Sequence, residues 1–406
     1  MNLGVLPGAT GFTADGGATA INDKGEVVGA AGAADGHQHA FLWTQAAGME
    51  DLGLLPGGLV SEAADINDAG EVVGTAETGS SYAHAFLWSR TTGMRDLGTL
   101  PGGAASQAFG INESHQVTGY SLNAGGGQRP VVWSASGAIQ DLGTFPGSFG
   151  TFGQDINESG QVAGFSDDPT TGGLLRGFVW TEAGGFQSVG TLPGGSGSGA
   201  SALNDLTQVV GLADAADGEN HAFLWSASDG IRDLGVLPGS EFSLAQGINN
   251  ASQVVGSANR SAFIWTDAAG MQPLPPLLGG TLASASDINN LGQIVGAGET
   301  VIDSVHANRP VLWNPGAGTP ASQVEGLITQ VGDLVDSGEL EEQDASPLLT
   351  KLQRALQILL DAKPATAVQG QLGAFIHQVK AMVASGRLSD SRGEELLAAA
   401  RCIAGE

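Results

Sequence analysis

One phrase of five residues recurs seven times in this sequence, and no other feature restricts the fold as strongly. It reads HAFLW at residues 39–43, 84–88 and 221–225, and it drifts to RPVVW, RGFVW, SAFIW and RPVLW in the other copies. Each copy ends on one of the chain's seven tryptophans: Trp43, Trp88, Trp133, Trp180, Trp225, Trp265 and Trp313. Spacings of about 40–48 residues are typical of β-propeller blades, each of which is a sheet of four strands.

Every repeat contains the same four strand-like segments in the same order. The second repeat shows them as SEAADIN, EVVG, HAFLW and MRDLG, which we name strands A, B, C and D. Their β-branched and aromatic residues favour strands, and the IN-D-x-G phrases between them supply the residues of tight turns. The 65 glycines among 406 residues fit an all-β fold with many such turns.

Small residues at one register of strand A predict which strand lies innermost. Three residues before the Ile or Leu of each IN or LN pair stand Ala18, Ala63, Ala108, Gly153, Ala200, Ala245 and Ala285. Such residues suit strands that converge around an axis, so we expect strand A there. The large Phe and Trp side chains of strand C are expected to pack between blades, farther out.

The first residues of the chain are predicted to complete the last blade. The seventh repeat has no strand D after Trp313, whereas NLGVL at residues 2–6 matches a strand D that has no repeat before it. Pairing this segment with the last blade closes the ring and removes the free sheet edges. The sequence therefore predicts a closed, seven-bladed, all-β propeller over residues 1–318.

Residues 322–406 predict a second domain, a small four-helix bundle. The apolar residues of VEGLITQVGDLV and VQGQLGAFIHQVKAMV each lie on one helical face. Ser346 before Pro347 predicts a helix start, and Ser391 with Glu394 predicts a capping box for the last helix.

Both parts resemble known families. The phrases DLGTLPGG, IN..GQVVG and HAFLW resemble the HAF repeat family of bacterial, mostly predicted-extracellular proteins, although the sixth repeat has Ser261 in place of His. AFIHQVKAMVASGRLS resembles the FIMAH-type helical domain at the C-termini of secreted bacterial proteins. The resemblance implies a secreted repeat protein with a helical module for protein contacts, and it implies no particular activity.

Composition limits the location and the partners. The chain opens inside a repeat, so we expect an extracellular protein whose leader precedes Met1, with a cytoplasmic protein as the alternative. Cys402 is the single cysteine and forms no internal disulfide. No run of 18 apolar residues exists, so no membrane span is expected. A net charge of −27 repels nucleic acid, which we do not expect as a partner.

The first position of the five-residue phrase is basic in six of seven copies. Its residues are His39, His84, Arg129, Arg176, His221, Ser261 and Arg309. Chain direction places them on the rim that also carries the LPGG loops and the B–C loops. In one hypothesis each ties its strand to a neighbouring carboxylate or carbonyl, such as Asp65, Asp155 or Asp287 of the DIN phrases. In the other they form a positively charged mouth that binds an anionic ligand, such as a carboxylated or sulfated glycan.

The third and fourth repeats carry the least repetitive loops. GSFGTFGQD adds Phe149 and Phe152, and SDDPTTGGLLRG adds Asp167 and Asp168. Aromatic and carboxylate side chains beside the two arginines of this rim predict a site for a sugar ring, although loop variation without function is the alternative. We expect no cofactor. Asp167 and Asp168 are the candidate ligands for calcium, but their spacing differs from known calcium loops.

These features favour a non-enzymatic, extracellular binding or scaffold protein that recognises a glycan or another surface ligand on its rim. The alternative is a propeller enzyme, such as a polysaccharide lyase, a glycoside hydrolase or a lactonase. The fold itself does not decide between them. Only two tyrosines exist, Tyr82 and Tyr120, which restricts Tyr-based lyase mechanisms.

Overall fold

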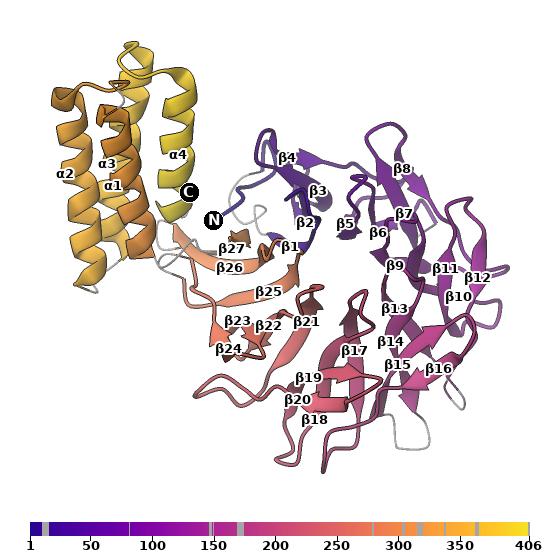
Figure 1. Cartoon of the computed structure of the whole chain (residues 1–406). Helices are drawn as coiled ribbons and strands as arrows, with labels where there is room; N and C mark the ends of the chain where they lie inside the picture. Colours follow the sequence, from indigo (N-terminus) through magenta and orange to yellow (C-terminus); the bar gives the residue numbers. More distant parts are fainter. Residues whose placement is uncertain are drawn as a thin grey trace.

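A computed structural model shows a ring of seven antiparallel sheets with four helices beside it (Figure 1). The structure describes residues 1–9, 16–80, 82–145, 148, 150–168, 174–277, 280–302, 305–314, 320–336, 338–361 and 365–404. The prediction of a seven-bladed β-propeller followed by a small helical region is therefore confirmed.

Each blade runs from strand A to strand D in the order predicted. The A strands are β1 (Gly16–Ile21), β5 (Ser61–Ile66), β9 (Ser106–Ile111), β13 (Thr151–Ile156), β17 (Ser198–Leu203), β21 (Leu244–Ile248) and β25 (Ala283–Ile288). The B strands are β2 (Val27–Gly32), β6 (Val72–Glu77), β10 (Val117–Leu122), β14 (Val162–Asp168), β18 (Val209–Asp214), β22 (Val254–Ala258) and β26 (Ile294–Ile302). The C strands are β3 (Gln38–Thr44), β7 (Ala83–Ser89), β11 (Gln128–Trp133), β15 (Leu174–Thr181), β19 (Asn220–Ser226), β23 (Ser261–Thr266) and β27 (Val305–Trp313). The D strands are β4 (Gly48–Asp51), β8 (Gly93–Asp96), β12 (Ile139–Asp141), β16 (Gly185–Ser188), β20 (Gly230–Asp233) and β24 (Gly270–Pro273).

The A strands lie innermost, as their small residues predict. Each contacts the next around the ring, and β1 contacts both β5 and β25. The C strands supply the packing between blades: Phe86 and Trp88 of blade 2 are buried against Val28 and Leu42 of blade 1. We call the side with the LPGG and B–C loops the top face, and the side with the A–B turns the bottom face.

The first residues of the chain close the ring. Asn2 forms an antiparallel bridge with Val311 of β27, and the Leu3 N–H donates to the Pro310 carbonyl at 2.9 Å. In return, the Leu312 N–H donates to the Met1 carbonyl at 2.8 Å. This segment is therefore the fourth strand of blade 7, and the ribbon shows the N-terminus beside β27 (Figure 1).

A continuous ring of hydrogen bonds joins the A–B turns on the bottom face. In every blade, the asparagine of the IN or LN pair is buried and donates from its side chain to the carbonyl of its counterpart in the next blade. The last bond of the ring runs from Asn289 to the Asn22 carbonyl at 2.9 Å. Since every blade holds the next, this ring of asparagines fixes the diameter of the channel.

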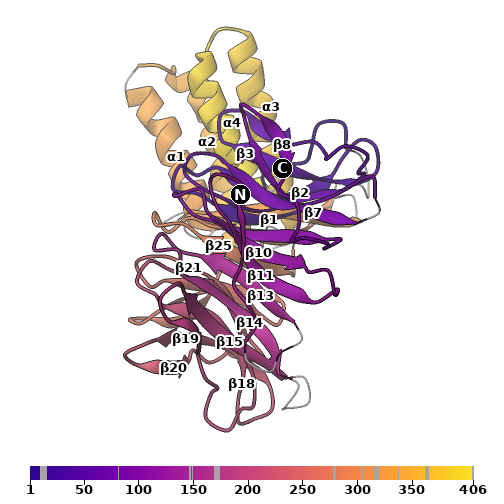
Figure 2. The ribbon, with the colours of Figure 1, turned by 90° about the vertical axis from the view of Figure 1, so that its right-hand side faces the viewer.

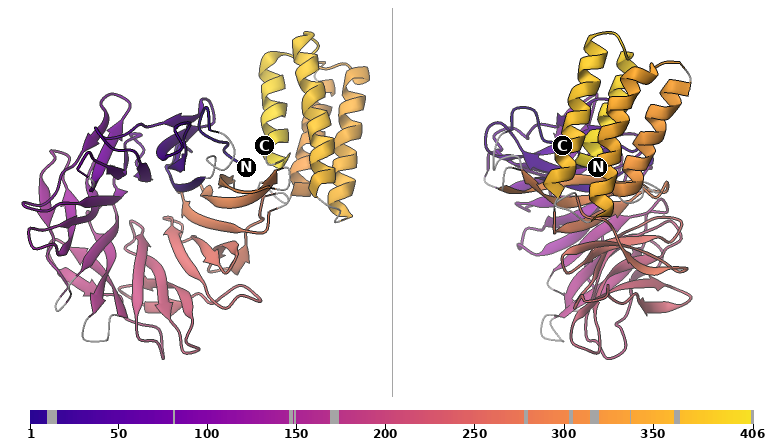
Figure 3. Two further views of the ribbon diagram at one scale, coloured as in Figure 1. Left: turned by 180° about the vertical axis from the view of Figure 1, so that it is seen from behind. Right: turned by 90° about the vertical axis from the view of Figure 1, so that its left-hand side faces the viewer.

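The helices α1 (Pro320–Asp336), α2 (Glu342–Leu360), α3 (Ala365–Ala384) and α4 (Asp390–Ala404) share a hydrophobic core of their own. The expected start of α2 at Pro347 is wrong: the helix begins at Glu342, where acidic residues of the first turn favour it, and Pro347 lies inside it. Figures 2 and 3 show the bundle beside blade 7, outside the ring. None of the described helices has the length and hydropathy of a transmembrane segment.

Candidate functional site

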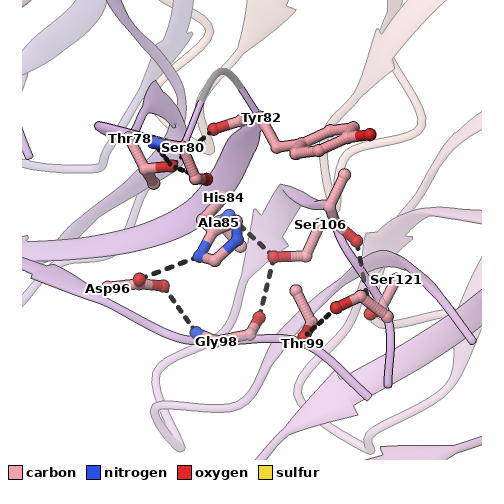
Figure 4. A network of polar contacts seen from close by, with 12 residues as sticks. Thr78, Ser80, Tyr82, His84, Ala85, Asp96, Gly98, Thr99, Ser106 and Ser121 are labelled. Carbon is pink, nitrogen blue, oxygen red and sulfur yellow. Dashed lines mark hydrogen bonds and ion pairs between the residues drawn. The ribbon is translucent and has the colours of Figure 1, made fainter. Parts of the chain in front are cut away.

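The histidines of the rim pair with an aspartate of their own blade. Nδ1 of His84 lies 2.8 Å from Oδ2 of Asp96 (Figure 4). His39 and His221 make the same contact with Asp51 and Asp233, at 2.8 and 2.9 Å. The partner is the aspartate of the DLG phrase in the adjacent D strand. The first hypothesis named the aspartates of the DIN phrases as candidate partners, and these are not the aspartates that the three histidines contact.

A serine of the next blade completes this contact. Ser106 accepts the Ala85 N–H at 3.0 Å and donates to the Gly98 carbonyl at 2.7 Å, while Asp96 accepts the Gly98 N–H (Figure 4). We call this set of a basic residue, an aspartate and a serine the clasp. It joins the outer strands of one blade to the first strand of the next. The basic residues therefore lie over the outer half of the ring, on the third strand of each blade.

The arginines of the rim are placed less uniformly. Nε of Arg129 lies 3.8 Å from Asp141, and Arg176 lies over the Phe145 ring at 5.8 Å. Arg309 is buried and donates to the Asn308 carbonyl at 2.9 Å.

The predicted calcium ligands are only partly described. Asp167 accepts the Gly150 N–H at 2.8 Å, which occupies one carboxylate oxygen. The side chain of Asp168 and all of Phe149 lie outside the described residues. Within the described part of the chain, no three His, Cys, Asp or Glu side chains are grouped so as to hold a metal ion. Calcium binding here stays a prediction.

Phe152 joins a row of aromatic rings on blades 3 and 4, while its predicted partner Phe149 lies outside the described residues, so the pair beside the rim arginines stays a prediction. The Phe152 ring lies 5.1 Å from that of Phe165 and 5.3 Å from that of Tyr120, centroid to centroid. Tyr120 lies 6.1 Å from Phe109. All four side chains are partly exposed. We call Phe109, Tyr120, Phe152 and Phe165 the aromatic platform.

The platform ends at the channel because of a repeated irregularity in the A strands. Each A strand contains a β-bulge, which turns one extra side chain toward the axis. The seven bulge residues are Thr19, Ala64, Phe109, Gln154, Ser201, Gln246 and Ser286. They surround a cavity of about 360 Å³ in the channel. An aromatic ring, two amides and three hydroxyls therefore face one open cavity in the channel.

Three carboxylates lie at the base of this cavity. Asp65 accepts the N–H groups of Ile66 and Ile111, both at 2.8 Å, and so joins blades 2 and 3. Asp155 joins blades 4 and 5 in the same way, and Asp287 joins blades 7 and 1. Each aspartate therefore holds two blades through backbone donors.

The narrow channel makes it costly to keep these carboxylates charged. Desolvation raises the pKa of Asp155 to about 6, and the backbone donors offset part of that effect. Desolvation, with repulsion from Asp155 and Asp287, raises the pKa of Asp65 well above its usual value. The pKa of Asp287 is also raised, again mainly by desolvation.

Sequence reasoning missed the platform and the channel cavity, although part of the signal was present. Tyr120 and Phe165 stand at a register of strand B where the other blades carry Ala30, Thr75, Leu212, Ser257 and Ala297. Comparing equivalent positions would have marked blades 3 and 4 as exceptional. The bulges, in contrast, depend on the pairing of β-strands and leave no mark on composition.

Comparison with known proteins supports the fold. No family model and no curated protein match the sequence. A puromycin hydrolase structure matches with a TM-score of 0.51 at 14% identity, over 77% of this chain and 53% of that one. TolB from Acinetobacter baumannii matches with a TM-score of 0.40 at 10% identity, over 66% of each chain. The fucose-specific lectin from Aleuria aurantia matches with a TM-score of 0.34 at 12% identity, over 75% of this chain and 93% of that one.

This chain thus spans less than two thirds of the length of TolB and about half of that of the hydrolase. At 14% identity, the match to the hydrolase shows a shared propeller fold alone.

Proposed function

We propose that this propeller is a carbohydrate-binding protein, without catalytic activity of its own, that holds a neutral sugar in the upper half of its channel. The observation that carries the proposal is the aromatic platform, which ends at a cavity lined by amides, hydroxyls and carboxylates. The apolar C–H face of a sugar ring packs on aromatic rings, and its hydroxyls bond to planar amides and carboxylates. A cavity of about 360 Å³ has the size of small-molecule sites.

The charge of the cavity favours a neutral sugar. Asp65, Asp155 and Asp287 line it, and none of the residues described as lining it is Lys, Arg or His. Carboxylates without cationic partners repel an anionic ligand and accept hydroxyl donors. The rim histidines, which would favour an anionic glycan, already face aspartates.

The bonding of the aspartates favours binding over catalysis. Each carboxylate holds two backbone N–H groups from two blades, so both oxygens have structural partners. A carboxylate fixed in this way can still accept a sugar hydroxyl through a second lone pair, but it cannot move toward a reacting atom as a nucleophile or a general acid must.

The setting of the protein belongs to the same proposal. The DLG.LPGG, IN..G and HAFLW phrases support membership of the HAF repeat family and action outside the cell, and AFIHQVKAMVASGRLS supports a FIMAH-type helical module that contacts another protein. Detection of the protein in the culture medium rather than in the cell pellet of its host tests the location.

Calorimetric titration with a panel of neutral oligosaccharides tests the binding site. We expect Tyr120→Ser and Phe152→Ala to weaken binding at least tenfold, because each removes part of the stacking surface. Tyr120→Ser installs the residue that blade 6 carries at this register, so the fold should tolerate it. Tyr82→Ala is the matched control, since this ring is 52% exposed and lies outside the platform. Unchanged affinity in both platform variants, or no binding of any neutral oligosaccharide, contradicts the proposal.

A further inference from the structure

One junction between blades lacks the whole clasp. Between blades 6 and 7, Ser261 stands where other blades carry His or Arg. Pro273 replaces the aspartate, and Ala283 replaces the serine. The serine that accepts a backbone N–H from the third strand of blades 1, 2 and 5 therefore has no counterpart at this junction.

The strands around this junction leave a cavity on the top face. The turn between β22 and β23 has only two residues, Asn259 and Arg260, because Ala258 pairs directly with Ser261. The neighbouring β26 and β27 are the longest strands described, with nine residues each. A short turn beside a long hairpin produces a cavity of about 270 Å³, which is separate from the channel cavity.

The lining of this notch, as we call the cavity, presents one unpaired positive charge. Arg260 is exposed, and no hydrogen bond or ion pair joins its side chain to any described residue. The Glu299 carboxylate in the same cavity is engaged, since it accepts the N–H and the hydroxyl of Thr281 at 3.0 and 2.6 Å. The Glu299 carboxylate keeps its charge but is buried, so the exposed charge of the notch is that of the Arg260 guanidinium.

The remaining groups suit a hydroxylated ring. The hydroxyls of Ser257 and Ser284 line the notch. Asn259 accepts the Glu241 and Phe242 N–H groups at 3.2 and 3.3 Å, which leaves its amide N–H₂ group for a ligand. Phe242, on the loop before β21 that this bond holds beside Asn259, has a side chain that is 41% exposed and offers an apolar surface near the notch.

We propose that the notch binds an acidic sugar residue, with its carboxylate held by the Arg260 guanidinium. A guanidinium binds a carboxylate through two parallel hydrogen bonds, and the serines and the amide take the ring hydroxyls. This site is distinct from the neutral-sugar site of the channel and does not depend on it.

Calorimetric titration of the full chain with trigalacturonate and with its methyl ester tests the proposal. The ester keeps the rings and hydroxyls but has no charge. We expect saturable binding of the acid, at least tenfold weaker binding of the ester, and at least a tenfold loss of acid binding in Arg260→Gln. Arg260→Lys should retain part of the affinity, because the charge remains but the paired hydrogen bonds do not.

Two further variants keep the test decisive. Arg95→Gln removes a charge from an exposed arginine on the outer strand of blade 2 and should leave binding unchanged. Ser257→Tyr places in the notch the residue that blade 3 carries at this register, and it should block binding without unfolding the blade. Equal binding of acid and ester, equal affinity in Arg260→Gln, or no saturable binding of the acid overturns the proposal. Binding of neutral sugars in the channel should be unchanged in all these variants.

Discussion

Asp65, Asp155 and Asp287 occupy a register at which the other four blades carry alanine or glycine. Gly110 shows why neighbouring blades cannot both carry a large residue at this register. A Cβ at Gly110 would lie 3.1 Å from the Cα and from a carboxylate oxygen of Asp155 in the next blade. An aspartate on one blade thus requires a small residue on its neighbour. Each of the three aspartates joins one pair of blades, so six blades are joined in this way. Blade 6 is the exception, because this register holds Ala202 in blade 5 and Gly247 in blade 6, and neither side chain can accept the Ile248 N–H.

The raised carboxyl pKa values predict that the propeller is more stable in mild acid than at neutral pH. Asp155 has a pKa of about 6 when folded, above the usual value of 3.8 that an aspartate has in an unfolded chain, so the folded state binds the proton more tightly. Above pH 6 the charged carboxylate lowers the free energy of unfolding by its full amount, and this loss disappears as the pH falls from 6 toward 4. We expect the free energy of unfolding in urea to rise by about 1–3 kcal/mol from pH 7.5 to pH 5.

Asp155→Asn is the matched variant for this measurement. It loses one backbone hydrogen bond, so it is less stable than the parent at pH 5, but its stability should change less between pH 5 and pH 7.5. A free energy of unfolding that rises with pH in the parent protein, or an identical pH profile in the variant, contradicts the role given to this carboxylate.

At the scale of strands, the order of phrases predicted the blades, the inner A strands and the closure of the ring. The partners of the rim histidines were missed because they depend on register: antiparallel pairing of β7 with β8 sets Phe86 against Asp96 and so brings that carboxylate to His84. The platform has the same origin, since Tyr120 and Phe152 are far apart along the chain and meet only where blade 3 faces blade 4. The start of α2 was predicted wrongly for a local reason, because an acidic first turn before Pro347 outweighed the proline signal.

Removal of the closing strand should open the ring. Without residues 1–6, β27 loses its bonds to Met1 and Leu3, and Leu3 and Leu6 leave a hydrophobic core that they share with Phe41 and Trp43. We expect the melting temperature to fall by 5 °C or more, because an exposed edge replaces a paired one. Replacing the same six residues by a scrambled segment of equal composition is the control for chain length. A melting temperature unchanged by the deletion excludes this mode of closure.

At the scale of the molecule, the ring and the bundle have separate hydrophobic cores. The bundle core contains residues of the four helices and of the loops between them, and the propeller cores contain residues of the ring only. Because the bundle lies outside the ring, it does not cover the channel (Figure 3). We therefore expect the ligand binding proposed for the ring and the protein contact proposed for the bundle to be independent of each other.

A chain that ends at residue 318 tests this independence. We expect it to keep the affinity of the full chain for its neutral sugar and for the acidic sugar within twofold, since neither cavity is lined by a described residue of the bundle. The melting temperature of the propeller should change little. Loss of either affinity in a folded truncated chain places part of that site on the helices and contradicts the independence of ring and bundle.

A crystal structure with the tightest neutral oligosaccharide of the panel shows where a neutral sugar binds. We expect a sugar ring in the upper channel, packed on the aromatic platform, with hydroxyls bonded to Gln154 and Gln246. A sugar bound in an outer groove between blades, with the channel left unchanged, contradicts this expectation.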